Sequence, residues 1–171
     1  MKIAVIGYSG SGKSTLAKAL AAHYGIPVLH LDSVNFVPGW EERDREEAMA
    51  QVLAFMQQPD WVIDGNYGGF YRKERLAAAD EIIFLNFPRR ICLLRAYRRY
   101  RTYRGRVRED MAPGCAEKFD FEFLRWIMWE GRTKQKKQQY ARICRKYADK
   151  TVVLKHPKQV ENYLQSKNIT T

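Results

Sequence analysis

The chain of 171 residues predicts a three-layer α/β sandwich, in which a parallel sheet of five strands carries helices on both faces. Two observations predict this fold. Short apolar runs alternate along the chain with segments of helical periodicity. The first apolar run also leads directly into a glycine-rich loop followed by a helical segment, as in phosphate-binding loops. We expect one domain that spans residues 1–171.

The glycine-rich loop reads GYSGSGKST over residues 7–15 and fits the Walker A pattern. Backbone N–H groups and the positive end of the helix dipole bind phosphates at such a loop. We expect Lys13 to reach the β- and γ-phosphates of a nucleotide, and the Ser14 hydroxyl to bind Mg²⁺. A glycine-rich turn that binds nothing is the alternative. The candidate nucleotide-binding residues are Gly7, Ser9, Gly10, Ser11, Gly12, Lys13, Ser14 and Thr15.

The elements of the first half follow from apolar runs and from the breaks between them. Leu16, Ala19 and Leu20 recur on one helical face, and a Gly-Ile-Pro break follows this helix. The expected elements are a strand at 2–6, a helix at 14–24, a strand at 28–31, a loop at 33–40, a helix at 42–57 and a strand at 61–63.

The second half continues the alternation of strands and helices. Pro88 suits the first turn of a helix, and residues 102–118 contain glycine and proline without periodicity, which predicts a loop or lid. The expected elements are a helix at 71–79, a strand at 81–85, helices at 89–101 and 119–147, a strand at 150–154 and a helix at 157–165. With the phosphate loop after the central strand, we expect the strand order 2-3-1-4-5.

Two carboxylates follow strands and are candidates for chemistry. Asp64 ends the WVID run, as in a Walker B strand, so we expect it to hold Mg²⁺ or its waters. A strand–Asp–Gly turn is the alternative. Asp32 ends the second strand, at the edge where parallel sheets bind ligands, and could orient or deprotonate an acceptor. A capping or turn aspartate is the alternative, and we interpret His30 as a core histidine.

Arginines are concentrated in one segment of the second half. Arg95 and Arg99 lie one turn apart on one helix face, as required to bind a transferring phosphoryl group. A solvated basic helix is the alternative. The arginines between residues 89 and 108 are Arg89, Arg90, Arg95, Arg98, Arg99, Arg101, Arg104, Arg106 and Arg108.

The composition narrows the class of protein. The net charge of +11 favours polyanionic partners, among which nucleotides, nucleic acids and acidic membranes all qualify. No apolar segment approaches transmembrane length, and nothing resembles a signal peptide. Cys92, Cys115 and Cys144 have no metal-ligand spacing and are expected to be reduced thiols in a cytoplasmic protein.

Several segments together resemble the topology-modulation (FlaR-like) proteins, which are similar to adenylate kinase and other small nucleoside and nucleotide kinases. The resemblance covers nearly the whole chain. It rests on GYSGSGKST, on LHLD with Trp40, on WVIDGNY, on IIFLNFPRR and on the PGC…W…W region.

This resemblance implies a P-loop NTPase fold, an ATP site and an arginine-bearing lid at about 102–118. It also implies that Arg95 and Arg99 bind phosphate, together with Arg132 or, as the less favoured alternative, Arg125. No adenosine-monophosphate pocket is recognisable and the lid lacks zinc ligands, so the acceptor is not carried over from adenylate kinase.

We expect an ATP-dependent phosphotransferase that moves the γ-phosphoryl group to a small molecule, with nucleotides among the candidate acceptors. Lys13, Asp32, Arg95, Arg99 and Arg132 are the candidate catalytic residues, with ATP and Mg²⁺ as cofactors and Ser14 and Asp64 at the metal. The alternative is a nucleotide-dependent DNA-binding protein that modulates DNA topology through its arginines. We expect weak nucleic-acid binding and no membrane partner. A regulatory GTPase is disfavoured because no Asn-Lys-x-Asp signature occurs, although ATP and GTP are not distinguished.

Overall fold

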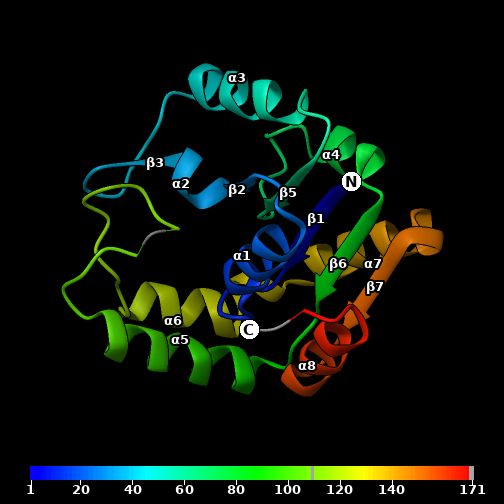
Figure 1. The fold of residues 1–171 in the computed structure, drawn as a ribbon. Coiled ribbons are helices and arrows are strands. Elements are labelled where there is room, and N and C mark those ends of the chain that lie inside the picture. The colour runs from blue at the N-terminus through cyan, green and yellow to red at the C-terminus, as the bar shows by residue number, and fades with distance from the viewer. Residues whose placement is uncertain (109, 170–171) are drawn as a thin grey trace.

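The computed structural model describes residues 1–108 and 110–169. It shows a three-layer sandwich with a parallel sheet of five strands in its middle, as the sequence predicts (Figure 1). The expected domain range of 1–171 includes residues 109, 170 and 171, which lie outside the described part, and the expected lid at 102–118 includes residue 109. The strands of the sheet are β1 (Lys2–Gly7), β2 (Val28–His30), β5 (Trp61–Asp64), β6 (Glu81–Leu85) and β7 (Thr151–Leu154).

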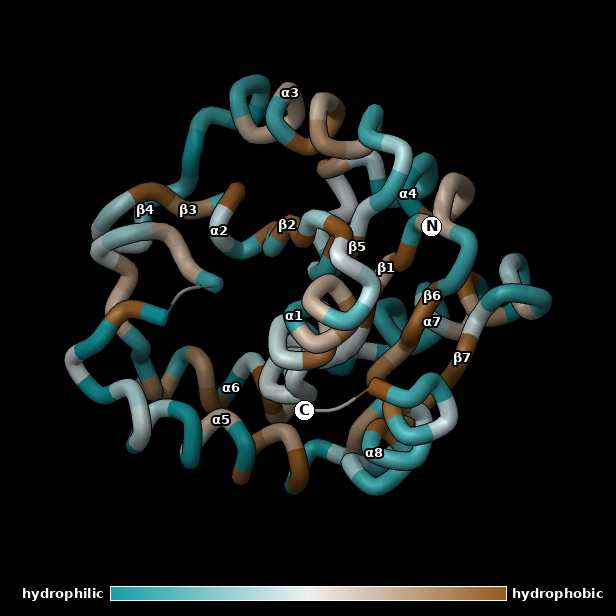
Figure 2. The backbone as a smooth tube through the Cα atoms, viewed as in Figure 1, coloured by the Kyte–Doolittle hydropathy of each residue, from teal (hydrophilic) through white to brown (hydrophobic). Residues whose placement is uncertain are grey.

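The strands lie in the order β2-β5-β1-β6-β7, which reads 2-3-1-4-5 when these five strands alone are numbered along the chain. β1 is the central strand, with Val5 opposite Asp64 on one side and Ile83 on the other. Because both faces of a parallel sheet are covered, its strands are mainly apolar, and polar residues such as Lys2, Asp64 and Glu81 lie at their ends. Figure 2 shows this concentration of hydrophobic residues along β1, β6 and β7.

Helices cover both faces of the sheet. α1 (Lys13–Tyr24) and α8 (Pro157–Ser166) lie on one face, and α4 (Arg72–Ala78) and α7 (Lys134–Lys146) lie on the other (Figure 1). α1 buries Leu16, Ala17 and Leu20 against the sheet. α3 (Arg45–Met56) begins later than expected, because the Asp44 carboxylate caps it by accepting hydrogen bonds from the backbone N–H groups of Glu46 and Glu47.

The helix expected over 119–147 is wrong as a single element. It is divided into α6 (Phe121–Met128), the 3₁₀ turn η1 (Glu130–Arg132) and α7. The Thr133 hydroxyl caps α7 by accepting a hydrogen bond from the backbone N–H of Lys136 at 3.2 Å. A Cβ on Gly131 would lie 2.8 Å from the Trp126 carbonyl oxygen, so the chain turns tightly between the two helices.

The loop expected over 33–40 is also more ordered than the sequence indicates. It contains most of α2 (Leu31–Asn35) and the strand β3 (Phe36–Val37), which pairs antiparallel with β4 (Glu41–Glu42). Asp32 therefore lies in the first turn of a short helix and not at the end of a strand. α5 (Arg89–Tyr103) continues two residues beyond the expected end.

The expected lid packs against the β3–β4 ribbon. Met111, Ala112 and Cys115 are buried there and form a small apolar cluster with Phe36 and Trp40. The Trp40 indole N–H donates a hydrogen bond to the Ala116 carbonyl oxygen at 3.0 Å. The described part of this segment is therefore packed beside the β3–β4 ribbon.

Within the described residues, no helix combines the length and the apolar character needed to cross a membrane.

The phosphate loop passes very close to α5 at Gly10. This residue has φ +76°, and an added Cβ would lie 2.4 Å from the Cys92 carbonyl oxygen. Gly25 has a similar φ of +64°, but an added Cβ there meets no atom within 4 Å. Alanine at Gly25 would therefore introduce backbone strain alone, whereas alanine at Gly10 would introduce both backbone strain and steric overlap with α5.

Gly10→Ala should lower the free energy of unfolding much more than Gly25→Ala. The left-handed backbone costs about 1–2 kcal/mol at either position. Overlap with α5 should add about 1–3 kcal/mol at Gly10 only. Denaturant titration of both variants measures the difference, and equal losses of stability would show that α5 does not restrain the loop.

Candidate functional site

The phosphate loop joins β1 to α1 and presents the N-terminus of α1 to solvent. No side chain caps this end at Gly12, so the first N–H groups of the helix stay available to a ligand. Lys13 folds back over the loop, and its ammonium group donates to the Tyr8 carbonyl oxygen at 3.4 Å. The loop therefore combines backbone donors with a lysine cation, which is an arrangement suited to polyphosphate.

Asn66 fastens the loop to the sheet edge. Its side-chain amide donates to the Gly7 carbonyl oxygen at 2.6 Å and accepts from the Gly7 backbone N–H at 3.1 Å. Both polar groups of Gly7 are thereby satisfied at the point where β1 turns into the loop. The sequence prediction did not single out Asn66, although it directly follows the Asp-Gly pair after β5.

Ser14 and Asp64 meet where α1 begins and β5 ends. The Ser14 hydroxyl donates to Asp64 Oδ2 at 2.9 Å, and His30 Nδ1 lies 2.5 Å from Asp64 Oδ1. His30 and Asp64 are paired residues of the neighbouring strands β2 and β5. His30 is buried, as expected, and it also orients the candidate metal carboxylate.

This pair of oxygen donors fits Mg²⁺. Mg²⁺ binds through one or two protein oxygens and completes its octahedron with waters and substrate phosphates. Ser14 supplies a hydroxyl beside the phosphate loop, and Asp64 supplies a carboxylate that is only 3% exposed and held by two partners. Asp64 lies where a Walker B carboxylate is expected, although the magnesium role remains a prediction.

One cleft of about 860 Å³ extends from the phosphate loop to α2 and the loop after β5. Its lining includes Lys13 and Ser14 at one end, and Asp32, Trp40 and Tyr67 at the other. Basic side chains outnumber acidic ones along this cleft. The basic residues that line it are Lys13, Arg72, Arg95, Arg98, Arg99, Arg108 and Lys136, and the acidic ones are Asp32 and Glu42.

Asp32 faces this cleft and is held by Tyr67. The phenol donates to Asp32 Oδ1 at 2.8 Å. Burial is the main cause that raises the pKa of Tyr67, and the charge and hydrogen bond of Asp32 raise it further. Tyr67 therefore stays a neutral donor at physiological pH. It leaves the second carboxylate oxygen without a protein hydrogen bond among the described residues.

Arg95 and Arg99 both line the cleft but differ in their partners. Arg95 lies directly over the loop, because a Cβ on Gly12 would be 2.5 Å from its Nη2. Among the described residues, no carboxylate lies within ion-pair distance of Arg95. Arg99 instead donates from Nε and Nη2 to Glu117 Oε1, at 2.8 and 2.7 Å.

Glu117 connects Arg99 to Arg108, in the segment expected to be a lid. Its second oxygen forms a 2.7 Å ion pair with Arg108, which also pairs with Asp110 at 2.6 Å. Burial is the main cause that lowers the pKa of Arg99, and the nearby Arg108 lowers it further, while Glu117 acts in the opposite direction. Two buried carboxylates thus hold two arginines of the cleft.

Arg132 does not lie in the cleft with the other candidate catalytic residues. It is buried, donates to the Phe87 carbonyl oxygen at 2.7 Å and to Cys92 Sγ at 3.1 Å, and lies 3.7 Å from the Tyr8 ring centroid. The cleft lining does not include it. The physical reason is the break at Gly131, which turns Arg132 beneath the phosphate loop.

Arg125, the alternative to Arg132, is also outside the cleft lining and forms an exposed ion pair with Glu130 at 2.6 Å.

Lys136, in the first turn of α7, lines the cleft in place of these two arginines. Its ammonium group donates to the Glu130 carbonyl oxygen at 2.8 Å and lies 3.7 Å from the Trp126 ring centroid. Burial lowers the pKa of Lys136. The sequence prediction missed it because it assumed one continuous helix.

Residues 3–63 match the family model of the ATPase family associated with various cellular activities (AAA). This match covers less than half of the chain, contains the phosphate loop and ends one residue before Asp64. No curated protein matches the sequence. The topology-modulation (FlaR-like) relation is therefore not confirmed.

Solved structures of small-molecule kinases have the same fold. A shikimate kinase from Bacteroides thetaiotaomicron is 19% identical, with 98% of this chain and 96% of that chain covered and a TM-score of 0.56. A gluconokinase from Sinorhizobium meliloti 1021 is 18% identical, with coverage of 96% and 87% and a TM-score of 0.56. A shikimate kinase from Acinetobacter baumannii, in complex with shikimate, is 17% identical, with coverage of 98% and 92% and a TM-score of 0.56. The chain therefore has a P-loop kinase fold.

Asp64→Asn should weaken Mg²⁺ binding in the nucleotide complex by about 10–100-fold, because one anionic oxygen donor is removed. Calorimetric titration with ATP at several Mg²⁺ concentrations measures this loss. Asp149→Asn is the matched control, because Asp149 is exposed and lies outside the cleft. An unchanged Mg²⁺ requirement in Asp64→Asn would make Asp64 a structural residue.

Proposed function

We propose that this protein is an ATP-dependent phosphotransferase that transfers the γ-phosphoryl group to a hydroxyl of a small molecule. One observation carries the proposal: the phosphate loop and Asp32 line the same cleft of about 860 Å³. A nucleotide at the loop and an acceptor at Asp32 would therefore meet inside one cavity. The kinase folds of the structural neighbours support this proposal.

Lys13 and the loop N–H groups would bind the phosphates of ATP. When polyphosphate arrives, the Lys13 ammonium group exchanges its long contact with the Tyr8 carbonyl oxygen for phosphate oxygens. Ser14 and Asp64 would hold Mg²⁺, which neutralises charge on the β- and γ-phosphates when it is bound.

Asp32 would position the acceptor hydroxyl. Tyr67 fixes one oxygen of its carboxylate, so the other can accept a hydrogen bond from the acceptor or take its proton. Arg72 lines the same part of the cleft and donates to the Asn66 carbonyl oxygen at 3.5 Å. A cation beside a carboxylate suits an acceptor that carries both hydroxyl and acidic groups.

Arg95, Arg99 and Lys136 would stabilise the negative charge of the transferring group. Charge spreads over the equatorial oxygens in the transition state, so fixed cations around them lower the barrier. Lys136 takes the role that the sequence prediction gave to Arg132. Arg99 is free for this role only after it leaves Glu117.

The proposal also covers the family, the domain organisation and the location of the protein. We propose that it is related to the topology-modulation (FlaR-like) proteins, that it forms a single domain with a lid at 102–118, and that it is cytoplasmic. The cluster of the lid with Phe36 and Trp40 supports the lid, because it brings the segment over the acceptor end of the cleft.

An acceptor screen tests the proposal. We expect ATP consumption with at least one acceptor among nucleosides, nucleotides and small hydroxylated acids, with shikimate and gluconate tried first. Lys13→Ala should abolish this consumption, because the cation that binds the phosphates is lost. Lys73→Ala, an exposed lysine of α4, is the matched control. Consumption that survives in Lys13→Ala would contradict the proposal.

Asp32→Asn separates acceptor chemistry from nucleotide binding. We expect the transfer rate to fall by about 10²–10⁴ while ATP affinity stays nearly unchanged. Steady-state kinetics and ATP titration measure the two effects. Glu41→Gln removes an exposed carboxylate outside the cleft lining and should keep the wild-type rate. A rate in Asp32→Asn within a few-fold of wild type would leave Asp32 as a structural residue of α2.

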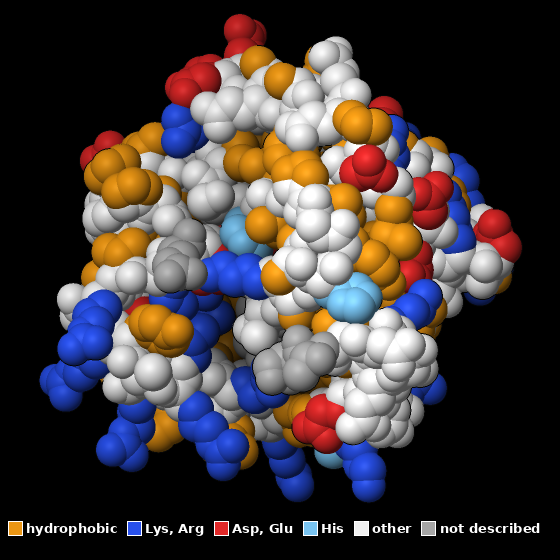
Figure 3. Space-filling model, in the orientation of Figure 1, with side chains coloured by type: hydrophobic (Ala, Val, Ile, Leu, Met, Phe, Trp, Pro, Cys, Tyr) orange, Lys and Arg blue, Asp and Glu red, His pale blue; other side chains and the backbone are white. Residues whose placement is uncertain are grey.

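A nucleotide-dependent DNA-binding protein is the second candidate. Exposed arginines on and after α5 favour it, and Figure 3 shows Lys and Arg side chains gathered along that edge. None of these arginines forms an ion pair with a described carboxylate. They are Arg98, Arg101, Arg104 and Arg106.

Nucleotide-induced ordering of the lid distinguishes the two candidates. We expect ATP–Mg²⁺ to protect backbone amides of residues 100–118 from hydrogen exchange, because lid closure follows polyphosphate binding. Duplex DNA should bind weakly, without sequence preference, and dissociate near physiological salt. DNA binding that stays tight at that salt, with no nucleotide-induced protection, would favour the second candidate.

A further inference from the structure

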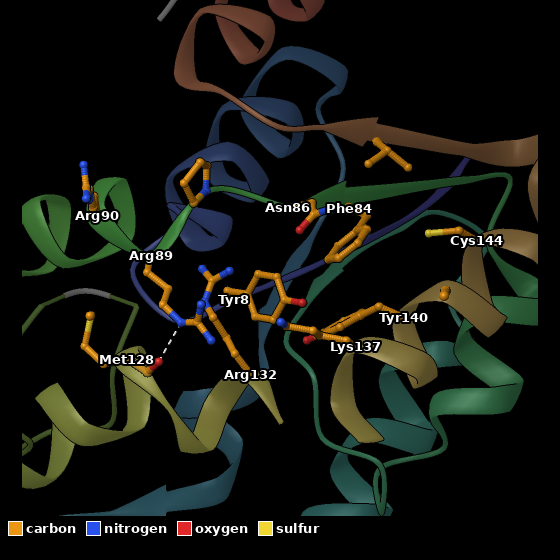
Figure 4. A pocket seen from close by; sticks show the side chains of 13 residues that line it. Tyr8, Phe84, Asn86, Arg89, Arg90, Met128, Arg132, Lys137, Tyr140 and Cys144 are labelled. Carbon is orange, nitrogen blue, oxygen red and sulfur yellow. Dashed lines mark hydrogen bonds between the residues drawn. The ribbon is translucent and has the colours of Figure 1, made fainter. Parts of the chain in front are cut away.

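A second cavity of about 650 Å³ lies between α7, the end of β6 and the first turn of α5 (Figure 4). Tyr8 and Tyr140 border both this cavity and the nucleotide cleft. No residue of the phosphate loop from Ser9 to Thr15 lines it. The two cavities therefore adjoin at these two tyrosines but have otherwise different linings, and the volume of the second lies within the range of small-molecule sites.

Its wall is a cluster of three aromatic rings. Phe84 and Tyr140 stack with centroids 4.5 Å apart and an interplanar angle of 16°. Tyr8 meets Tyr140 edge-on at 5.2 Å. Burial raises the pKa of both tyrosines, so their hydroxyl groups stay neutral. Such a wall suits a planar apolar group.

The rest of the lining is strongly basic. Arg89, Arg90, Arg132 and Lys137 contribute to it, and no lining residue carries a carboxylate. None of these four cations forms an ion pair with a carboxylate among the described residues. Arg132 is only 8% exposed, and its Nε has no hydrogen-bond partner within the described part of the chain. The other contacts of Arg132 are with neutral groups, the Phe87 carbonyl oxygen, Cys92 Sγ and the Tyr8 ring, so no described carboxylate neutralises the charge of this cluster.

We propose that this cavity binds a small organic anion with a planar apolar body. The body packs against the aromatic cluster of Tyr8, Phe84 and Tyr140, and its carboxylate, sulfonate or phosphate group interacts with Arg89, Arg90 and Lys137. The site is independent of the proposed phosphotransferase activity, because it uses none of the residues assigned to phosphoryl transfer.

Two dyes that share an aromatic body test the role of charge. Anilinonaphthalene sulfonate is an anion, and N-phenylnaphthylamine lacks the sulfonate. We expect the anionic dye to bind the wild-type protein at least about tenfold more tightly, as judged by fluorescence titration. Equal affinities for the two dyes would overturn the anion assignment.

Two pairs of substitutions locate the site. Arg90→Gln with Lys137→Gln removes exposed cations of the rim and should weaken binding of the anionic dye about tenfold. Lys134→Gln with Arg142→Gln removes the same net charge from exposed positions of α7 outside the lining, and should change affinity by less than about twofold. Equal effects of the two pairs would overturn the proposal.

Cys144 provides a second readout that does not depend on a variant. It lines the cavity and is partly exposed, whereas Cys92 and Cys115 are buried. The bound anionic dye should slow alkylation of Cys144 by iodoacetamide, as followed by mass spectrometry of peptides. An alkylation rate that is unchanged at saturating dye would place the dye elsewhere and overturn the proposal.

Discussion

The buried carboxylate of Asp64 is the constraint on which the site depends. A charged group that is 3% exposed must be compensated, and its partners come from two other elements, Ser14 of α1 and His30 of β2. The carboxylate therefore ties the first turn of α1 to β2 and β5. Asn66, two residues later, ties the start of the phosphate loop to the same sheet edge. The loop geometry and the candidate magnesium site are thus set by one set of contacts.

The sequence predicted the layers, the five parallel strands and the phosphate loop, because these depend on local patterns of apolar residues and glycines. It also indicated Asp64, which terminates an apolar run. His30 was recognised as buried, but its bond to Asp64 requires knowing that β2 and β5 are neighbours with these two residues in register. The expected strand order made the two strands neighbours, but it did not give their register, so the pairing of His30 with Asp64 appears only in the structure.

The failures of prediction lie where short-range geometry changes the direction of the chain. The turn at Gly131 divides one expected helix into two, and it exchanges Arg132 for Lys136 in the cleft. The ribbon of β3 and β4 has two residues in each strand, too few for any periodicity to appear. Ion pairs such as Arg99–Glu117 join residues of different segments, so neither residue carries a local signal for its partner.

Glu117 gives the cleft an internal competitor for phosphate. Any anion that is to engage Arg99 must displace a carboxylate that is already bound there and that also holds Arg108. A singly charged anion gains too little to separate this network, whereas a polyphosphate with Mg²⁺ offers several contacts at once. In the proposed phosphotransferase, the carboxylate would rebind Arg99 after transfer and so favour departure of the product. The same contact would then select ligands by charge on entry and shorten their residence on exit.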